Sequence, residues 1–301
     1  MSSNDLHYLD LVDVARRIKV GALSPVALTE AMLLGVLGGV VSVAVVLRRF
    51  AFVSDALTHT VFPGVVIGFM VAGAGGIVWG ALVFAVFSAV LLTVLSSNRR
   101  VTEDATLAIL LTGFFSVGVV LVSRRSSYTA DLTAFLFGRI LTVDRREILE
   151  TAVVTVLVLT VLAMLGKELL LRAFDPDGSA ALGYRVGLLD LALNVMVALV
   201  VVAAVKAVGT LLVIALLVVP AAAARLLTDR LALLVGASVL VGVLGGWLGL
   251  AVSYHASVYY GLRLASGATV VLALVALYAV AFAVGSARRM VSHHAPAAER
   301  A

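Results

Sequence analysis

The chain has 301 residues, of which 62% are hydrophobic and 13% are charged, and its mean hydropathy is +1.16. A soluble domain is about half apolar and about a quarter charged, so this composition excludes an ordinary soluble protein and indicates several membrane spans. The net charge of +5 does not indicate a nucleic-acid partner, because the arginines stand in pairs between apolar runs, as at cytoplasmic loop ends. The absence of cysteine excludes disulfides and thiolate metal ligands.

Residues 1–25 are polar and amphipathic and precede the first apolar run. They carry three aspartates and no apolar core, so we do not expect a cleavable signal peptide here. We interpret them as an amphipathic N-terminal arm that lies at the membrane interface. A disordered tail is the alternative.

Apolar runs long enough to cross a bilayer follow one another over residues 26–287, which we interpret as the transmembrane domain. We expect an all-α polytopic protein with about nine spans, and eight to ten is the range that the pattern allows. The nine expected spans are residues 27–47, 50–72, 77–96, 105–123, 147–166, 191–206, 210–227, 231–252 and 266–286. Residues 288–301 are expected to form a C-terminal tail.

Basic residues mark alternate ends of these spans. They are Arg48 with Arg49, Arg99 with Arg100, Lys167 with Arg172 and Arg185, Arg225 with Arg230, and Arg288 with Arg289. Cytoplasmic loops carry an excess of Lys and Arg, so nine spans place these ends inside and the amino terminus outside. The segment 124–146 does not fit, because it would lie outside although it carries five arginines. Either it is a re-entrant or surface segment, or the number of spans differs by one.

The stretch SDALTHTVFPG at residues 54–64 brings two ionisable side chains into the second span. Asp55 and His59 are four residues apart, so they share one helix face at a distance of about 6 Å. Counted from Arg48 and Arg49 at 1.5 Å per residue, they lie roughly 10 Å and 16 Å deep. Each costs about 2.5–3.5 kcal/mol inside a span, and carboxylate with imidazole is a ligand pair for zinc, manganese or iron. The spacing alone leaves open a metal site, a proton path, a structural pair and a helix cap.

A proline follows this pair. Pro63 has no N–H, so the carbonyl of His59 loses its helical partner. A freed carbonyl at that depth is tolerated only where protein or water covers it. Gly64 and Gly68 come next and would let a second helix approach closely. The sequence therefore predicts a carboxylate, an imidazole and a loosened backbone near the middle of the bilayer.

Residues 44–69, AVVLRRFAFVSDALTHTVFPGVVIGF, resemble the signature of the metal-cation permeases of ABC importers, the zinc, manganese and iron class. Further blocks resemble the same family in the same order, so that the resemblance spans roughly residues 30–285. These blocks are EDATLAILLTGFFSVGVVLVS at 103–123, DLTAFLFGRIL at 131–141, FDPDGSAALGYRVGLLD at 174–190, AVGTLLVIALLVVPAAAARLLT at 207–228 and SYHASVYYGLRLASGATVVL at 253–272.

The resemblance implies a permease with the fold of the cobalamin and siderophore importers, working as a dimer, expected to be a homodimer, with the pore at the subunit interface. It implies two cytoplasmic ATPase subunits, an external metal-binding protein and a location in a bacterial cytoplasmic membrane. The metal-contacting Asp and His of the family map onto Asp55 and His59. Manganese, zinc or iron is then the transported substrate rather than a resident cofactor. The sequence does not specify the metal, nor whether the second subunit is a sister chain.

The segment 174–190 is the longest polar insertion between spans and lies on the predicted inner side. By resemblance it is the coupling helix that docks on the ATPase; an ordinary solvated linker is the alternative. The residues expected to make this contact are Asp175, Pro176, Ala180, Gly183 and Tyr184. In the seventh span, Pro220 would free the carbonyl of Leu216, which we interpret as a kink rather than a gate.

We do not expect an enzyme. The one Gly-Lys pair, at 166–167, is followed by Glu168, whereas a phosphate-gripping loop needs Ser or Thr there. The alternative function is an ion-coupled secondary transporter that uses Asp55 and His59 as a proton or ion relay. Inverted repeats typify many such transporters, and the sequence shows no convincing repeat. A permease for an organic chelate would not need metal ligands in its pore.

Overall fold

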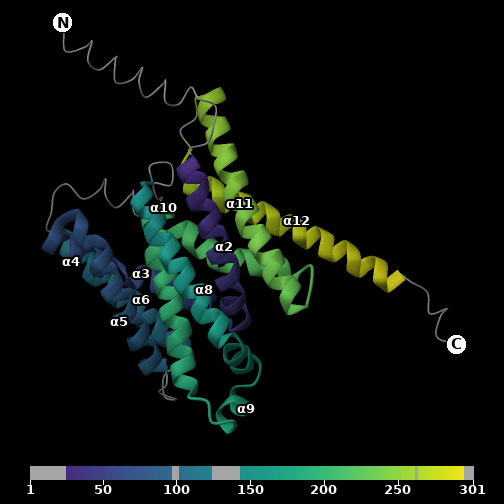
Figure 1. Cartoon of the computed structure of the whole chain (residues 1–301), viewed down its shortest axis with the longest axis horizontal. Helices are drawn as coiled ribbons and strands as arrows, with labels where there is room; N and C mark the ends of the chain where they lie inside the picture. The colour runs from purple at the N-terminus through teal and green to yellow at the C-terminus, as the bar shows by residue number, and fades with distance from the viewer. Residues whose placement is uncertain (1–24, 97–101, 124–142, 262–263, 295–301) are drawn as a thin grey trace, which may run out of the picture.

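The computed structural model describes residues 25–96, 102–123, 143–261 and 264–294, and within these ranges the chain is helical (Figure 1). Nine segments there are long and apolar enough to cross a membrane, which confirms the expected all-α polytopic fold. The predicted arm, except for its last residue, lies outside the described residues. So do the 131–141 block and the final residues of the predicted tail, 295–301.

The helices follow one another with short connections. The first half contains α2 (Pro25–Leu47), α3 (Ala51–Thr60), α4 (Phe62–Ala72), the 3₁₀ helix η1 (Gly73–Gly76), α5 (Ile77–Ser96) and α6 (Glu103–Ser123). The second half contains α8 (Arg145–Phe174), α9 (Pro176–Ala181), α10 (Val186–Arg225), α11 (Leu231–Tyr260) and α12 (Ser266–His294). Three of the expected spans, 147–166, 231–252 and 266–286, are therefore too short, since each helix continues for about two more turns.

Helix α2 is the centre of the molecule and packs against α8, α10 and α11. Its contact with α11 is a backbone contact, because a Cβ built on Gly35 would lie 2.8 Å from the backbone nitrogen of Val243. One turn further along, Ser238 donates a hydrogen bond to the carbonyl oxygen of Gly39 at 2.7 Å. Small residues four apart with a hydroxyl between helices are the usual means of packing in lipid.

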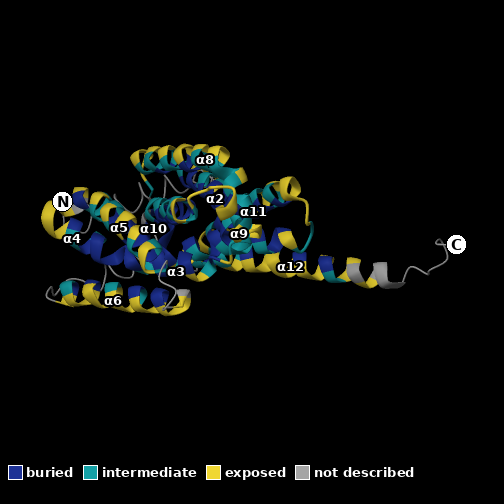
Figure 2. Cartoon of the chain, turned by 90° about the horizontal axis from the view of Figure 1, so that it is seen from below, coloured by how far each residue is buried: buried dark blue, intermediate teal, exposed yellow. Residues whose placement is uncertain are grey.

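Helices α3 to α6 form a second group beside α10, and α11 with α12 lie on the opposite side (Figure 1). The buried residues gather between these groups, whereas α6 and α8 show long exposed faces (Figure 2). The exposed side chains on these two helices include Ile109, Val117, Val120, Leu149, Val153 and Val156. Apolar side chains that point away from the bundle are expected where a helix faces lipid or another subunit.

Helix α10 contains two spans that meet at Gly209, whose φ of 77° and ψ of 166° are not helical. The chain turns back there. Asp190 lies beside Arg48, Ala203 and Ala207 lie beside Glu30 near the other end of α2, and Arg225 is again near Arg48. A positive φ is readily adopted only by glycine. The tight turn predicted at Val208 and Gly209 is thus confirmed.

Candidate functional site

The second span is divided into α3 and α4 at Val61, one residue before the turn that holds Pro63. Val61 donates its backbone N–H to the carbonyl oxygen of His59. The carbonyl of His59 therefore has a hydrogen-bond donor, although Pro63 has no N–H to donate to it. The predicted loosened backbone is a single-residue break, and the proline occupies the first turn of the new helix, where a missing N–H costs nothing.

Asp55 and His59 lie side by side on α3. The Nε2 atom of His59 is 3.5 Å from Oδ1 of Asp55, and the two side chains are 28% and 37% exposed. The His59 ring meets Phe115 of α6 edge-on, with ring centroids 5.8 Å apart. The helix face that packs against the rest of the chain carries Val53 and Leu57 instead. The predicted pair therefore points out of the subunit rather than into its core.

The hydroxyl groups on α3 do not join this pair. Ser54 and Thr58 donate to the carbonyl oxygens of Phe50 and Ser54, at 3.1 Å and 2.8 Å. Thr60 donates in the same way to Leu57 at 3.1 Å. Because all three are buried and bonded to their own helix, Asp55 and His59 are the polar side chains that α3 leaves partly exposed.

Two ligands do not complete a metal site. Among the described residues, no group of three or more His, Cys, Asp or Glu side chains is placed to hold a metal ion. A cation bound by Asp55 and His59 would need further ligands from water or from another subunit. Carboxylate oxygen and imidazole nitrogen suit manganese, iron and zinc alike.

Gly64 and Gly68 bring α4 against α5. A Cβ built on Gly64 would meet the carbonyl oxygen of Gly80, and one on Gly68 would meet that of Gly76. The close helix approach predicted from these glycines is present. A role of Gly64 in a pore stays a prediction.

Pro220 is buried in the second half of α10, which continues as a helix to Arg225. The carbonyl oxygen of Leu216 faces α2, since a Cβ built on Gly38 would lie 3.2 Å from it. The oxygen that Pro220 frees is thus covered by a glycine of the central helix. This packing supports the interpretation of Pro220 as a local distortion within a continuous helix.

The predicted coupling segment contains the short helix α9. Asp175 caps its start by accepting a hydrogen bond from the N–H of Gly178 at 2.8 Å, and Pro176 takes the first position, where proline is favoured. Gly183 ends the turn with a φ of 85°. Ala180 and Tyr184 are exposed. The segment is a capped, protruding turn with exposed side chains rather than an unstructured linker.

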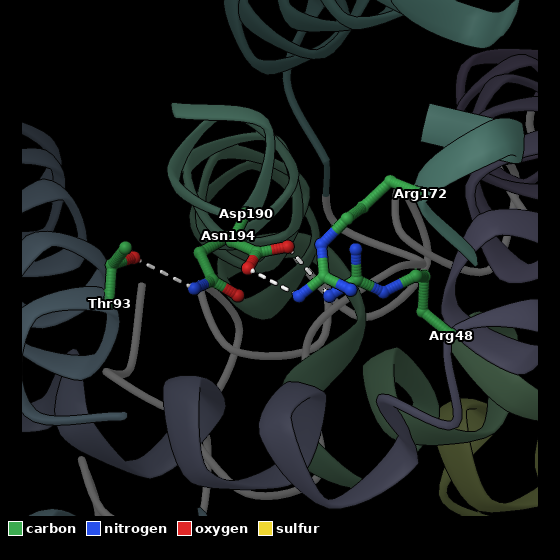
Figure 3. Close-up of polar contacts among 5 residues, drawn as sticks. All are labelled: Arg48, Thr93, Arg172, Asp190 and Asn194. Carbon is green, nitrogen blue, oxygen red and sulfur yellow. Dashed lines mark hydrogen bonds and ion pairs between the residues drawn. The ribbon is translucent and has the colours of Figure 1, made fainter. Parts of the chain in front are cut away.

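An ion-pair cluster that the sequence analysis missed lies beside α9 (Figure 3). Asp190 binds two arginines: its Oδ1 atom is 2.6 Å from Nη2 of Arg48, and its Oδ2 atom is 3.0 Å from Nη2 of Arg172. One turn later, Asn194 donates to Thr93 of α5 at 3.0 Å. The cluster joins the end of α2, the end of α8 and the start of α10. The only signal in the sequence was a lone acid at a loop end otherwise marked by arginines.

A second missed group is Glu30 in α2, which is fully buried. Thr151 of α8 donates to its Oε1 atom at 2.7 Å, whereas Oε2 has no partner among the described residues. A cavity of about 50 Å³ adjoins it and is also lined by Glu147 and Glu150. An acid inside the first apolar run was the available signal.

A sequence model of the ABC 3 transport family matches residues 23–285. The chain belongs to the ABC 3 transport family. The manganese transport system membrane protein MntC of Halalkalibacterium halodurans is 38% identical over 256 residues, 85% of each chain. The manganese import system permease protein ScaB of Streptococcus parasanguinis is 34% identical over 89% of this chain and 92% of its own. A probable iron transport system membrane protein of Haemophilus influenzae is 27% identical over 87% and 93%.

Solved structures show the same fold. PsaBC from Streptococcus pneumoniae, in complex with Fab, matches with a TM-score of 0.76 and 28% identity, over 90% of this chain and 95% of that chain. An inward-facing putative metal-chelate type ABC transporter matches with a TM-score of 0.67 at 18% identity, which supports the fold alone. This ABC 3 family member is thus a multi-pass protein of the cytoplasmic membrane with the predicted permease fold.

Proposed function

We propose that this protein is the permease subunit of an ATP-driven importer that moves a divalent metal cation into the cell, with manganese as the first candidate. The observation that carries the proposal is the Asp55–His59 pair, whose ligand atoms lie 3.5 Å apart on a face of α3 that the chain itself leaves partly exposed. Relatives of similar length are named as manganese and iron transport proteins. The cation is cargo, and no resident cofactor is proposed.

A second permease subunit would complete the site. The proposal places the pore at the dimer interface, where two Asp55–His59 pairs would face the same ion. Support comes from the exposure of both side chains and of their neighbours Phe52 and Phe115, because such a face is expected to be covered by something. A site of few, mixed oxygen and nitrogen ligands binds manganese weakly, which suits an ion that has to leave again.

In this proposal α9 couples ATP hydrolysis in the partner subunits to transport. In this proposal two ATPase subunits dock on the 174–190 segment from the cytoplasm, and an external binding protein delivers the metal. Asp190 lies near the start of α10, the helix that follows α9, and is paired with Arg48, three residues before α3 begins. A displacement of α9 would therefore reach the helix that carries the metal ligands through a single ion-pair cluster.

The alternative function is an ion-coupled secondary transporter that uses Asp55 and His59 as a proton or ion relay. Vesicles containing the permease with its ATPase and binding protein separate the two functions. Our proposal predicts that uptake of one metal among manganese, iron(II) and zinc needs ATP and survives dissipation of the ion gradients. Asp55→Ala and His59→Ala should abolish uptake while ATP hydrolysis persists, and Thr160→Val on the exposed face of α8 is the matched control. Uptake driven by a gradient without ATP would favour the secondary transporter.

A further inference from the structure

A cavity of about 450 Å³ lies where α2, α8 and α10 end on the basic side of the molecule. Its walls include four arginines and two aromatic rings, from Arg48, Arg49, Phe50, Arg172, Phe174 and Arg225. The excess of Lys and Arg on cytoplasmic loops places this side inside the cell. The cavity is therefore at the level of the inner headgroups, next to α9.

The cavity has a surplus of positive charge. Asp190 is shared by Arg48 and Arg172, so it compensates only one of the four arginines. Asp175 stands between two lining residues and adds a second negative charge, because the backbone N–H of Gly178 that it accepts is a neutral donor. The carboxyl ends of three helices contribute about half a negative charge each. Four arginines against two carboxylates leave an excess of two formal positive charges, which the helix ends only partly offset.

Some of this charge is already desolvated. The Arg48 side chain is only 9% exposed, and its guanidinium stacks on the Phe50 ring at 4.7 Å from the ring centre. The Nη1 atom of Arg48 and the Nε atom of Arg172 are buried and have no acceptor among the described residues. Buried donors without an acceptor are costly. A planar guanidinium with free N–H groups is suited to bind phosphate oxygens in a bidentate manner.

We propose that this arginine cavity binds a phosphate group, and that an anionic phospholipid of the inner leaflet carries it. Basic pockets between helices on the cytoplasmic side suit anionic headgroups. The apolar part of the wall, including Phe50, would accommodate the glycerol and the first methylene groups. Phe174, which also lines the cavity, is 71% exposed and offers further apolar surface at the same end. A bound headgroup would contact both the residues just before α3 and the start of α9.

The test uses the full chain in a neutral detergent and measures lipid adducts by native mass spectrometry. The probes are short-chain phosphatidylglycerol, the matched phosphatidylcholine and inorganic phosphate. The variant is Arg49→Gln with Arg225→Gln, which spares the Asp190 cluster, and Arg230→Gln at the same end of the bundle is the control. Each arginine near an anionic headgroup contributes about fivefold in affinity. We therefore expect the double variant to bind phosphatidylglycerol about 30-fold more weakly, with the control unchanged.

Several outcomes would overturn the proposal. Equal binding of the two lipids, or equal binding of phosphatidylglycerol by the double variant, would show that the cavity does not select an anionic headgroup. Arginine-dependent binding of inorganic phosphate without lipid binding would assign a soluble ligand. Loss of ATPase assembly in the double variant, with lipid binding unchanged, would assign the arginines to an acidic segment of that partner.

Discussion

Two acidic residues of the membrane domain, Glu30 and Asp55, lie in contrasting environments. Glu30 in α2 is fully buried and accepts a hydrogen bond from Thr151 of a neighbouring helix. Asp55 in α3 is 37% exposed, and its side chain meets the imidazole of His59 on the same helix. For Glu30 the chain itself supplies a donor to Oε1, whereas Oε2 has no partner among the described residues. An acid that faces outward, at a cost on insertion, requires something from outside the chain, and we propose that this is the transported cation.

The largest effect expected from this contrast is on uptake. Asp55→Asn removes a metal ligand, so we expect metal uptake to fall by about 100-fold or more, beyond the usual loss for a group that only orients a ligand. Glu30→Gln keeps an oxygen to accept the bond from Thr151 and should leave uptake within about twofold. Uptake assays on the two variants at equal expression make the comparison. A greater loss in Glu30→Gln would reverse the assignment of the two carboxylates.

Next in size is the effect of breaking the cluster at Asp190. Asp190→Asn leaves Arg48 and Arg172 without a countercharge, which weakens the connection between α9 and the start of α3. We expect uptake to fall about tenfold, a typical coupling effect, while metal binding is retained. Parallel measurement of ATP hydrolysis and uptake would show hydrolysis without matching transport. Asp229→Asn, an exposed acid after α10 that lies outside both the cluster and the 174–190 segment, serves as control, and an equal loss there would argue against the cluster.

Acid should have a smaller effect on the same site. Only the neutral imidazole of His59 has a lone pair for the cation, so protonation competes with metal binding. Lowering the pH from about 7.5 to about 5.5 should therefore reduce uptake several-fold. Uptake in His59→Gln should lose that pH dependence, whatever its residual rate. A wild-type rate that rises in acid would instead favour a proton relay.

The smallest effect concerns stability rather than transport. Thr151→Val removes the donor that serves the buried Glu30 carboxyl group, which costs about 1–3 kcal/mol in the free energy of unfolding. At roughly 2–4 °C for each kcal/mol, the thermal midpoint in detergent should fall by several degrees. Thr155→Val, whose hydroxyl bonds its own helix, is the matched control and should have a smaller effect. No difference between the two would show that the Glu30–Thr151 bond does not stabilise the fold.

Much of the fold followed from patterns local in sequence. Apolar runs predicted the spans, Gly209 predicted the turn inside α10, and Pro63 marked the break between α3 and α4. Spacing alone placed Asp55 and His59 on one helix face. The ends of α8, α11 and α12 were misjudged because the apolar signal ends where polar residues begin, although each helix continues.

Contacts between distant segments were not predicted. The Asp190 cluster joins residues that are 142 positions apart, from 48 to 190, and Glu30 meets Thr151 across 121 positions. Nothing in the local sequence specifies which arginine an acid will face once the helices have packed. The resemblance to metal-cation permeases indicated the family, whereas these polar contacts required the arrangement of α2, α8 and α10.

The central claim is that His59 and Asp55 hold the transported ion. Manganese(II) is paramagnetic, so its electron spin resonance spectrum in the purified protein reports directly on a bound nitrogen ligand. We predict nitrogen hyperfine coupling in the wild type, its loss in His59→Gln, and its retention in His255→Gln, which changes an exposed histidine at the end of α11. Manganese bound without a nitrogen ligand, or with coupling that survives in His59→Gln, would contradict the account.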